Sequence, residues 1–312
     1  MLDEFLWVER YRPRSIDETI LPKVLKENLQ AFVDRREIPN LLLSGPAGIG
    51  KTTVARAMLE EIEADYVVIN GSMNGNIDTL RNEIMHFATS MSFTGQRKFV
   101  ILDEADYLNA NSTQPALRNF MEEYSRNCGF ILTCNYASRI IAPLHSRCAE
   151  IVFNIPSEEA TSLARQFLKR AQAILTDSQV TFDKAVLVQV IQKFFPDWRR
   201  VLNELQRYSA TGSIDSGILT DFEEADLEKL LEFMRGKDYT SVRNWVASLG
   251  NNDHTAVYRK IYDTCSEYFS KNTIPAAVLI LAKYQYQSAF AADQEINLSA
   301  CIAELLIECE WA

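Results

Sequence analysis

The sequence predicts an α/β domain built on a parallel sheet, followed by a region that is helical throughout. Short apolar runs that end in polar residues alternate with amphipathic segments up to about residue 153. A glycine-rich turn joins one of these runs to a helical pattern. After Ile155-Pro156-Ser157 the periodicity is helical only, so the two regions differ in fold class.

Length and composition indicate an ordinary globular chain. The 312 residues suffice for about two or three domains, and 47% of them are hydrophobic and 24% charged, the usual balance for a soluble protein. The start lacks a secretory pattern, and the apolar runs are too short to cross a bilayer. We therefore expect a cytoplasmic protein that does not contact membranes.

The cysteines and the net charge argue against two kinds of site. No two of the six cysteines form Cys-x-x-Cys, and only three histidines are present, so we expect free buried thiols and no zinc module. The net charge of −10 argues against a surface that binds nucleic acid over its whole extent. A local basic face is compatible with that total.

The strongest pattern is "NLLLSGPAGIGKTTVARAMLEEI", where a strand over 40–44 and a helix over 52–62 flank a Gly-x-x-x-x-Gly-Lys-Thr turn. Glycines let successive N–H groups surround a phosphate, and the helix adds its positive end. Lys51 is expected to bridge the β- and γ-phosphates, and Thr52 to bind Mg²⁺. A glycine turn with a structural role alone is the alternative. The predicted nucleotide-binding residues are Gly45, Pro46, Ala47, Gly48, Ile49, Gly50, Lys51, Thr52 and Thr53.

Polar residues follow two later strands. "KFVILDEADYL" predicts a buried central strand over 99–102, after which Asp103 would hold Mg²⁺ and Glu104 would deprotonate the attacking water. "CGFILTCNY" predicts another strand, after which Asn135 would position that water or touch the γ-phosphate. The structural alternatives are helix-capping charges for the two acids and a turn residue for the asparagine.

Taken in order, the phosphate loop, "DEAD", "TCN" and "SRC" resemble the AAA+ ATPases, and among them the sliding-clamp loaders. The compact length is similar to that of the large ATPase subunits of T4-like bacteriophages. The resemblance implies an AAA+ ATPase domain, a helical lid and an all-α collar, with ATP and Mg²⁺ as cofactors. It also implies that Tyr11, Arg12 and Pro13 of "WVERYRP" wrap the adenine.

The pattern "FPDWRRVLNEL" resembles the second sensor of this family. It begins with Phe-Pro-Asp where cellular relatives have Gly-Asp, so Arg199 and Arg200 both qualify. We assign the sensor to Arg199, the first arginine after Asp197. The "DEAD" string also suggests a DEAD-box helicase, but the rest of the chain is too short and too helical for a second RecA-like domain.

Arg147 stands in "PLHSRCAEIVF", just before a short apolar run. Its end of the strand is expected to lie away from the chain's own phosphate loop, within reach of a neighbouring subunit's nucleotide. The resemblance implies that Arg147 is a finger acting across the interface, a task that suits a planar and permanently charged group. A surface ion pair is the alternative. Such a finger implies a head-to-tail ring or spiral. The resemblance implies a pentamer that contains copies of this chain and a small clamp-loader subunit.

The predicted domains are residues 1–153 for the ATPase domain, 154–222 for the lid and 223–312 for the collar. Ser157 is a suitable N-cap for the first lid helix. In the collar, Leu227, Leu230, Leu231 and Met234 follow helical spacing. Such a stripe is either core or subunit interface, and the pattern does not separate the two.

The resemblance also implies contacts with DNA and with the clamp. "GNIDTLRNEI" is similar to a family helix that touches a phosphate backbone, and a second helix begins after "DEAD". Met91 and Phe93 are expected to grip the sliding clamp as exposed apolar residues. Helix capping and packing onto the core are the alternatives. The candidate DNA contacts are Ile77 through its amide, Arg81, Ser112, Thr113 and Gln114.

The sequence thus predicts the ATPase subunit of a DNA-polymerase clamp loader. ATP binding would open a ring-shaped clamp, primer–template DNA would complete the active sites, and hydrolysis would release the clamp on DNA. One alternative is another AAA+ DNA-remodelling ATPase, such as a branch-migration or helicase-loading motor, which would lack the "WVERYRP" and "SRC" pair. The other is a non-catalytic scaffold subunit, against which intact Lys51, Asp103 and Glu104 argue.

Overall fold

The computed structural model describes residues 5–72, 77–92, 95–210, 212–215, 218, 227–248, 254–288 and 290–311. The chain divides into two compact units, Met1–Leu219 and Thr220–Ala312. The first unit holds the sheet together with the helices predicted to form the lid. The predicted domain boundaries at 153/154 and 222/223 stay predictions.

The first unit is built on a five-stranded sheet with the strand order β2-β3-β4-β1-β5. All neighbouring strands pair in parallel, for example with Leu42 opposite Leu132 and Ile101 opposite Ile131. β1 and β4 are buried along their whole length, as a sheet covered on both faces requires. The strands are β1 (Leu41–Ser44), β2 (Tyr66–Asn70), β3 (Lys98–Asp103), β4 (Cys128–Cys134) and β5 (Ala149–Val152). This architecture confirms the predicted α/β fold class.

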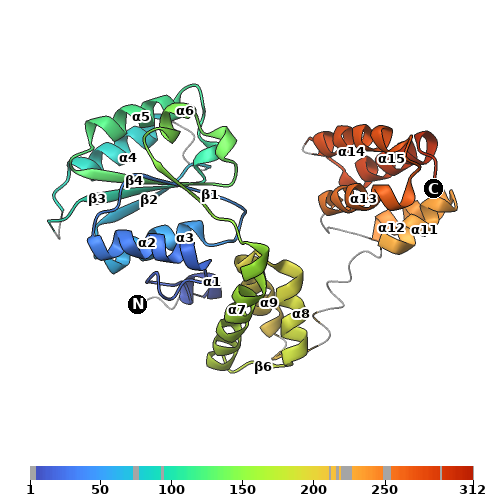
Figure 1. Ribbon diagram of the computed structural model, residues 1–312, viewed down its shortest axis with the longest axis horizontal. Coiled ribbons are helices and arrows are strands. Elements are labelled where there is room, and N and C mark those ends of the chain that lie inside the picture. Colours follow the sequence, from blue (N-terminus) through green and yellow to red (C-terminus); the bar gives the residue numbers. More distant parts are fainter. Residues whose placement is uncertain are drawn as a thin grey trace. The chain divides into compact units, whose positions relative to one another are not determined.

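Helices cover both faces of this sheet (Figure 1). Leu41 and Leu43 of β1 pack with α2 and α3, whereas Leu42 between them packs with α4, α5 and α6. Successive strand residues point to opposite faces, so one apolar run supplies two cores. The helices that precede or connect the strands of the sheet are α1 (Trp7–Arg10), α2 (Lys23–Arg35), α3 (Lys51–Glu61), α4 (Ile77–Thr89), the 3-10 helix η1 (Ala105–Tyr107), α5 (Thr113–Glu123), the 3-10 helix η2 (Ala137–Arg139) and α6 (Ala142–His145).

The helices α7 (Ser157–Asp177), α8 (Lys184–Phe194) and α9 (Trp198–Ser209) follow the sheet. Asp183 and Asp197 cap α8 and α9 by accepting hydrogen bonds from first-turn amides. The predicted N-cap of α7 is wrong: Pro156 takes that position, and Ser157 is already helical. A short parallel pair, β6 (Thr181–Phe182) with β7 (Ser213–Ile214), was not predicted, because two-residue strands leave no periodicity in a sequence.

The second unit consists of helices around one apolar core. Leu230, Leu231 and Met234 are all in this core, so these members of the predicted stripe serve packing within the unit. Buried Asn297 donates to Tyr258 Oη at 2.8 Å and to the Tyr284 carbonyl oxygen at 3.1 Å, which satisfies its amide. The helices are α11 (Leu227–Arg235), α12 (Tyr239–Ser248), α13 (His254–Tyr268), α14 (Ile274–Ser288) and α15 (Gln294–Glu308). Across the described residues of both units, no helix has the length and apolarity needed to cross a membrane.

Candidate active site

A cavity lies at the carboxyl ends of β1, β3 and β4, where ligands bind in parallel α/β sheets. The phosphate loop, the polar ends of the strands, the N-terminal segment and the lid all contribute to its walls. Gly45 and Pro46 precede the lining residues and turn their carbonyl oxygens toward Lys51. The predicted site residues that line the cavity are Tyr11, Arg12, Pro13, Ala47, Gly48, Ile49, Gly50, Lys51, Thr52, Thr53, Asp103, Glu104, Asn135 and Arg199.

The loop between β1 and α3 requires glycine at two positions. Gly48 has a φ of +70°, and a Cβ there would lie 1.7 Å from Asp197 Oδ1. Gly45 has a φ of +147°, and a Cβ there would lie 2.4 Å from the Phe153 carbonyl oxygen. Only glycine adopts these φ values without strain and also avoids the two steric clashes. The loop can therefore pack closely while it leads into the N-terminus of α3.

The Lys51 ammonium is buried and held by three oxygens. Nζ donates to the carbonyl oxygens of Gly45 at 2.8 Å and Pro46 at 2.7 Å, and to Asn135 Oδ1 at 2.9 Å. Burial lowers the pKa of Lys51, and the Arg199 guanidinium acts in the same direction, while the Asp103 carboxylate opposes them. The structure therefore brings Lys51 and Asn135 together. Two residues predicted to act on one phosphate group have to lie this close to each other.

Thr52 and Asp103 meet at the end of β3. Thr52 Oγ1 donates to Asp103 Oδ1 at 2.6 Å, and Thr133 Oγ1 donates to the same oxygen at 2.5 Å. Hydroxyl and carboxylate oxygens are the hard ligands that Mg²⁺ prefers. The residues present therefore fit this ion. Thr133 orients the carboxylate, a role that the sequence did not reveal.

Glu104 lines the cavity next to Asp103, in a backbone conformation that non-glycine residues rarely adopt. Its φ is +55°, in the left-handed region, and its N–H donates to Thr133 Oγ1 at 3.3 Å. Backbone strain of this kind concentrates at functional sites, where the surrounding structure holds it. The turn at Glu104 directs the chain away from β3, so two adjacent acids reach the same cavity.

Asp106 is a buried acid that fixes the segment after β4. Its Oδ2 accepts hydrogen bonds from the backbone N–H groups of Asn135 at 3.3 Å and Tyr136 at 3.2 Å. Its Oδ1 is buried and has no hydrogen-bond partner among the described residues. Asp106 therefore holds the Asn135 backbone. Sequence reasoning missed this role, because the last acid of "DEAD" has no pattern that separates it from a surface charge.

The N-terminal segment is tied to the lid at the apolar end of the cavity. Arg170 of α7 donates to the carbonyl oxygens of Tyr11 at 2.7 Å and Glu18 at 3.0 Å. Phe167 and Trp198 also line the cavity and stack with ring centroids 4.4 Å apart. The predicted adenine-binding segment thus shares one cavity with the phosphate loop. Arg170 was missed because a single arginine in an amphipathic helix resembles a solvated charge.

Helix α9 separates the two sensor candidates. Arg199 lines the cavity, whereas the Arg200 guanidinium lies over the Phe194 ring, 4.7 Å from its centroid. Neighbouring residues of a helix with 3.6 residues per turn point in different directions, so one of the two faces the cavity. The lid also reaches the phosphate loop directly, because the Trp198 N–H donates to the Gly48 carbonyl oxygen at 3.2 Å.

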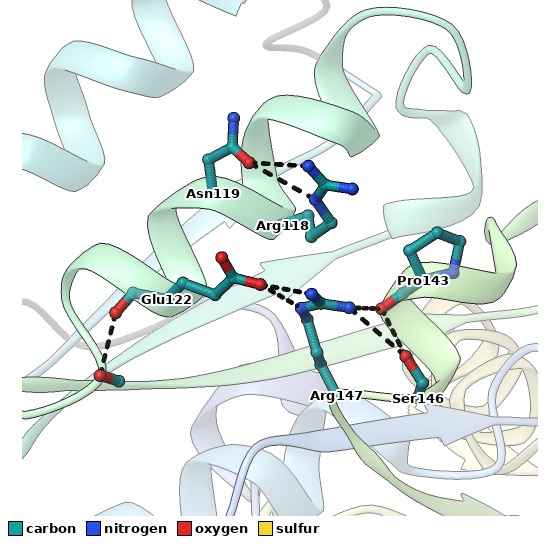
Figure 2. Close-up of polar contacts among 7 residues, drawn as sticks. Arg118, Asn119, Glu122, Pro143, Ser146 and Arg147 are labelled. Carbon is teal, nitrogen blue, oxygen red and sulfur yellow. Dashed lines mark hydrogen bonds and ion pairs between the residues drawn. The ribbon is translucent and has the colours of Figure 1, made fainter.

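Arg147 does not line the cavity, as far as the described residues define it. It follows α6 and pairs with Glu122 of α5, and it also donates to the Pro143 carbonyl oxygen at 2.9 Å (Figure 2). The ion pair named above as the alternative is therefore present. In the single subunit Arg147 is bound to its own surface, and its action on a neighbour stays a prediction.

The candidate DNA contacts fall into two groups. α4 begins at Ile77, which places that amide at a helix start, and the Ile77 side chain lies outside the described residues. Arg81 and Ser112 are exposed. Thr113 and Gln114 are both 0% exposed, and Gln114 Nε2 donates to two main-chain carbonyl oxygens. The assignment of these two side chains to DNA is wrong in this fold, because α5 turns them inward.

The residues expected to grip a clamp follow α4. Met91 is 92% exposed, so it does not fold back onto the core. Phe93 lies outside the described residues. The clamp contact itself stays a prediction.

Two family models match the first unit. One describes the ATPase family associated with various cellular activities (AAA) and matches residues 41–156. The other describes the AAA+ ATPase lid domain of the sliding-clamp-loader large subunit and matches residues 159–220. Together they cover the sheet and the helices above it that line the cavity.

Several relatives match along almost the whole chain. The sliding-clamp-loader large subunit of Enterobacteria phage T4 is 32% identical over 317 residues, which cover 99% of this chain and 98% of that protein. The same subunit of Escherichia phage RB69 is 32% identical over 314 residues, with 99% and 98% covered. The replication factor C small subunit of Halobacterium salinarum is 31% identical over 326 residues, with 98% and 97% covered.

Solved structures share the fold at lower identity. A RuvB mutant of Thermotoga maritima is 18% identical with a TM-score of 0.54, covering 80% of this chain and 85% of that chain. Identity at this level shows a common architecture alone, and so it does not support the branch-migration alternative. The family is shown by the relatives that match along almost the whole chain and by the lid-domain model. The chain belongs to the family of the sliding-clamp-loader large subunits, ATPases of DNA replication.

Proposed function

We propose that this chain hydrolyses ATP in sites that two adjacent subunits of a clamp loader build together. As a family member it is an ATPase subunit of a multi-subunit loader that acts on a sliding clamp. The observation that carries the composite site is the separation of Arg147 from the cavity lined by Lys51, Asp103 and Glu104. A guanidinium that lies outside the site of its own subunit can act only on the site of another.

The chain's own residues supply binding and proton transfer. The backbone of the phosphate loop and Lys51 bind the β- and γ-phosphates, and the Asn135 amide, now bonded to Lys51, positions the attacking water. Glu104 takes the proton of that water as it attacks the γ-phosphorus. Thr52 and Asp103 would hold Mg²⁺, which supplies positive charge against the phosphate oxygens. Arg199 carries the state of the γ-phosphate to the lid.

Assembly completes the site. Arg147 of the adjacent subunit stabilises the charge that develops on the transferred phosphoryl group. A head-to-tail contact of this kind produces a ring or spiral, for which we propose five subunits including a small companion. ATP binding then favours the assembled state that opens the clamp, and primer–template DNA aligns the interfaces. Hydrolysis releases the clamp on DNA.

DNA and clamp contacts are proposed for exposed positions around α4 and α5. The Ile77 amide and the exposed Arg81 and Ser112 suit a phosphate backbone, since a helix start and a guanidinium both favour anions. The net charge of −10 is consistent with a local DNA contact. Met91 suits an apolar pocket on a clamp because it is exposed and flexible.

The test is the steady-state ATPase rate of the chain alone and with primed DNA, clamp and a small subunit, added singly and together. We expect the full mixture to exceed the lone chain by at least about 10²-fold, because the finger alone contributes roughly 10³–10⁵. A lone chain at high dilution that hydrolyses ATP as fast as the full mixture contradicts the composite site. Stimulation without primed DNA contradicts the dependence on DNA.

Arg199→Ala is expected to lower ATP turnover about 10²-fold, because it removes a cationic donor that faces the phosphates. Arg200→Ala is the matched control, since Arg200 lies over Phe194 instead of in the cavity. Turnover of both variants is measured at saturating ATP. A larger loss in Arg200→Ala would move the sensor to Arg200, and equal losses would contradict an assignment to Arg199 alone.

A further inference from the structure

Four hydrogen bonds hold the Arg147 guanidinium within its own subunit. Its Nε at 2.9 Å and its Nη2 both donate to Glu122 Oε1. Its Nη1 donates to the Pro143 carbonyl oxygen at 2.9 Å and to Ser146 Oγ at 3.4 Å. Figure 2 shows the carboxylate and the two oxygens on different sides of the guanidinium.

This arrangement leaves no bidentate edge for a phosphate. Glu122 occupies the Nε–Nη2 edge, and the hydrogen bonds to Pro143 and Ser146 use Nη1, so neither two-donor edge has both of its nitrogens unengaged. An arginine that binds phosphate through a fork must present two N–H groups along one edge. The carboxylate also places a negative charge where a phosphate oxygen would have to come.

We propose that Glu122 restrains Arg147 in the unassembled subunit, and that the neighbour's nucleotide must displace this carboxylate before the finger acts. The proposal rests on the trans role of Arg147 stated above. Glu122 is then a positioning residue, because its ion pair with Arg147 weakens the binding of that arginine to the neighbour's nucleotide. A subunit therefore offers its finger only where a more highly charged anion competes for it.

The pair is suited to exchange because it is accessible to water. The Arg147 side chain is 32% exposed and the Glu122 side chain 58%, so solvent screens the attraction. Arg118 lies one helical turn before Glu122 on α5 and already lowers the pKa of that carboxyl, although less than Arg147 does. When Arg147 leaves, Glu122 keeps a cation within reach.

The test separates the finger from the pocket. Arg147→Ala protein keeps a pocket but lacks a finger, and Lys51→Met protein keeps a finger but lacks a working pocket. Full-length Lys51→Met protein is titrated into a fixed amount of Arg147→Ala protein with ATP, clamp and primed DNA. Hydrolysis then reports fingers that are supplied in trans. The two finger donors compared are Lys51→Met/Glu122→Gln and Lys51→Met/Glu123→Gln.

Glu123 is the matched control, because it is the next residue of α5, is exposed and carries the same charge. We expect the Glu122→Gln donor to reach half-maximal activation at about two- to fivefold lower concentration than the Glu123→Gln donor, the range for an exposed ion pair. The maximal rate should be equal. Raising salt from about 0.05 to about 0.3 M should bring the two donors together, since screening weakens the restraint.

Each outcome has one meaning. Equal half-activation concentrations at low salt, or a higher one for the Glu122→Gln donor, overturn the restraint. A difference that persists unchanged in high salt also overturns it, because the effect is then not an ion pair. If the Lys51→Met donor activates nothing, the trans role of Arg147 fails and the proposed composite site fails with it. Circular dichroism melting of each donor shows whether it is folded.

Discussion

We expect a Glu104→Gln subunit to bind ATP normally but to turn it over about 10²–10⁴-fold more slowly than the natural protein. The amide has the shape of the carboxylate, so the left-handed backbone and the neighbouring Asp103 site are kept. It cannot accept the proton of the attacking water. ATP and clamp therefore stay together in a stable complex, which gel filtration with labelled nucleotide detects.

Glu18→Gln is the control for this variant. Glu18 belongs to the N-terminal segment and lines the same cavity, so the substitution changes the cavity charge equally at a residue to which we assign no part in the attack of water. We expect its turnover to stay within about twofold of the natural value, as for a surface substitution. Unchanged turnover in Glu104→Gln would remove Glu104 as the base. Lost ATP binding in that variant would make its role one of binding.

We expect Arg147→Ala protein to inhibit its neighbours when it is mixed with the natural protein. An assembly that contains one such subunit has a pocket without a finger, and that pocket loses roughly 10³–10⁵ in rate. If the pockets act in a coordinated cycle, one failed pocket stalls the assembly. The ATPase rate of mixtures at constant total protein is therefore expected to fall faster than the mutant fraction rises.

The matched control is Arg139→Ala, an exposed arginine that follows β4 and lies over Tyr136, with its guanidinium 4.8 Å from that ring. Its mixtures should show no loss beyond simple dilution. A linear decline for Arg147→Ala would count against action in trans. Nucleotide affinity of isolated Arg147→Ala protein should be unchanged, because Arg147 is not among the residues that line the cavity in the described chain.

Residues that lie close together in the sequence were predicted well. The phosphate loop, the strand before Asp103 and the strand before Asn135 all have periodicity or spacing that reports local backbone geometry, and the structure shows these elements. The Arg199 assignment also depended on local spacing, and the helix places that residue at the cavity. The predicted Mg²⁺ ligands Thr52 and Asp103 needed one further inference, that the carboxyl ends of parallel strands lie at the same edge of the sheet.

Burial and contacts that depend on distant packing were not predicted. Thr113 and Gln114 look like polar residues at a helix start, and only the packing of α5 turns them inward. Arg170 and Tyr11 are far apart in the chain and meet only because α7 lies beside the N-terminal segment. No pattern in one sequence records a contact of this separation.

The sequence by itself determined the fold class and the phosphate loop, since the backbone geometry of short motifs is local, and its resemblance to the clamp loaders indicated the family. Tertiary structure alone decided which polar residues are buried, which of two adjacent arginines faces the cavity, and that Arg147 is bound by Glu122. The physical reason is that burial and ion pairing depend on distances between segments. Those distances exist only once the sheet and its helices have packed.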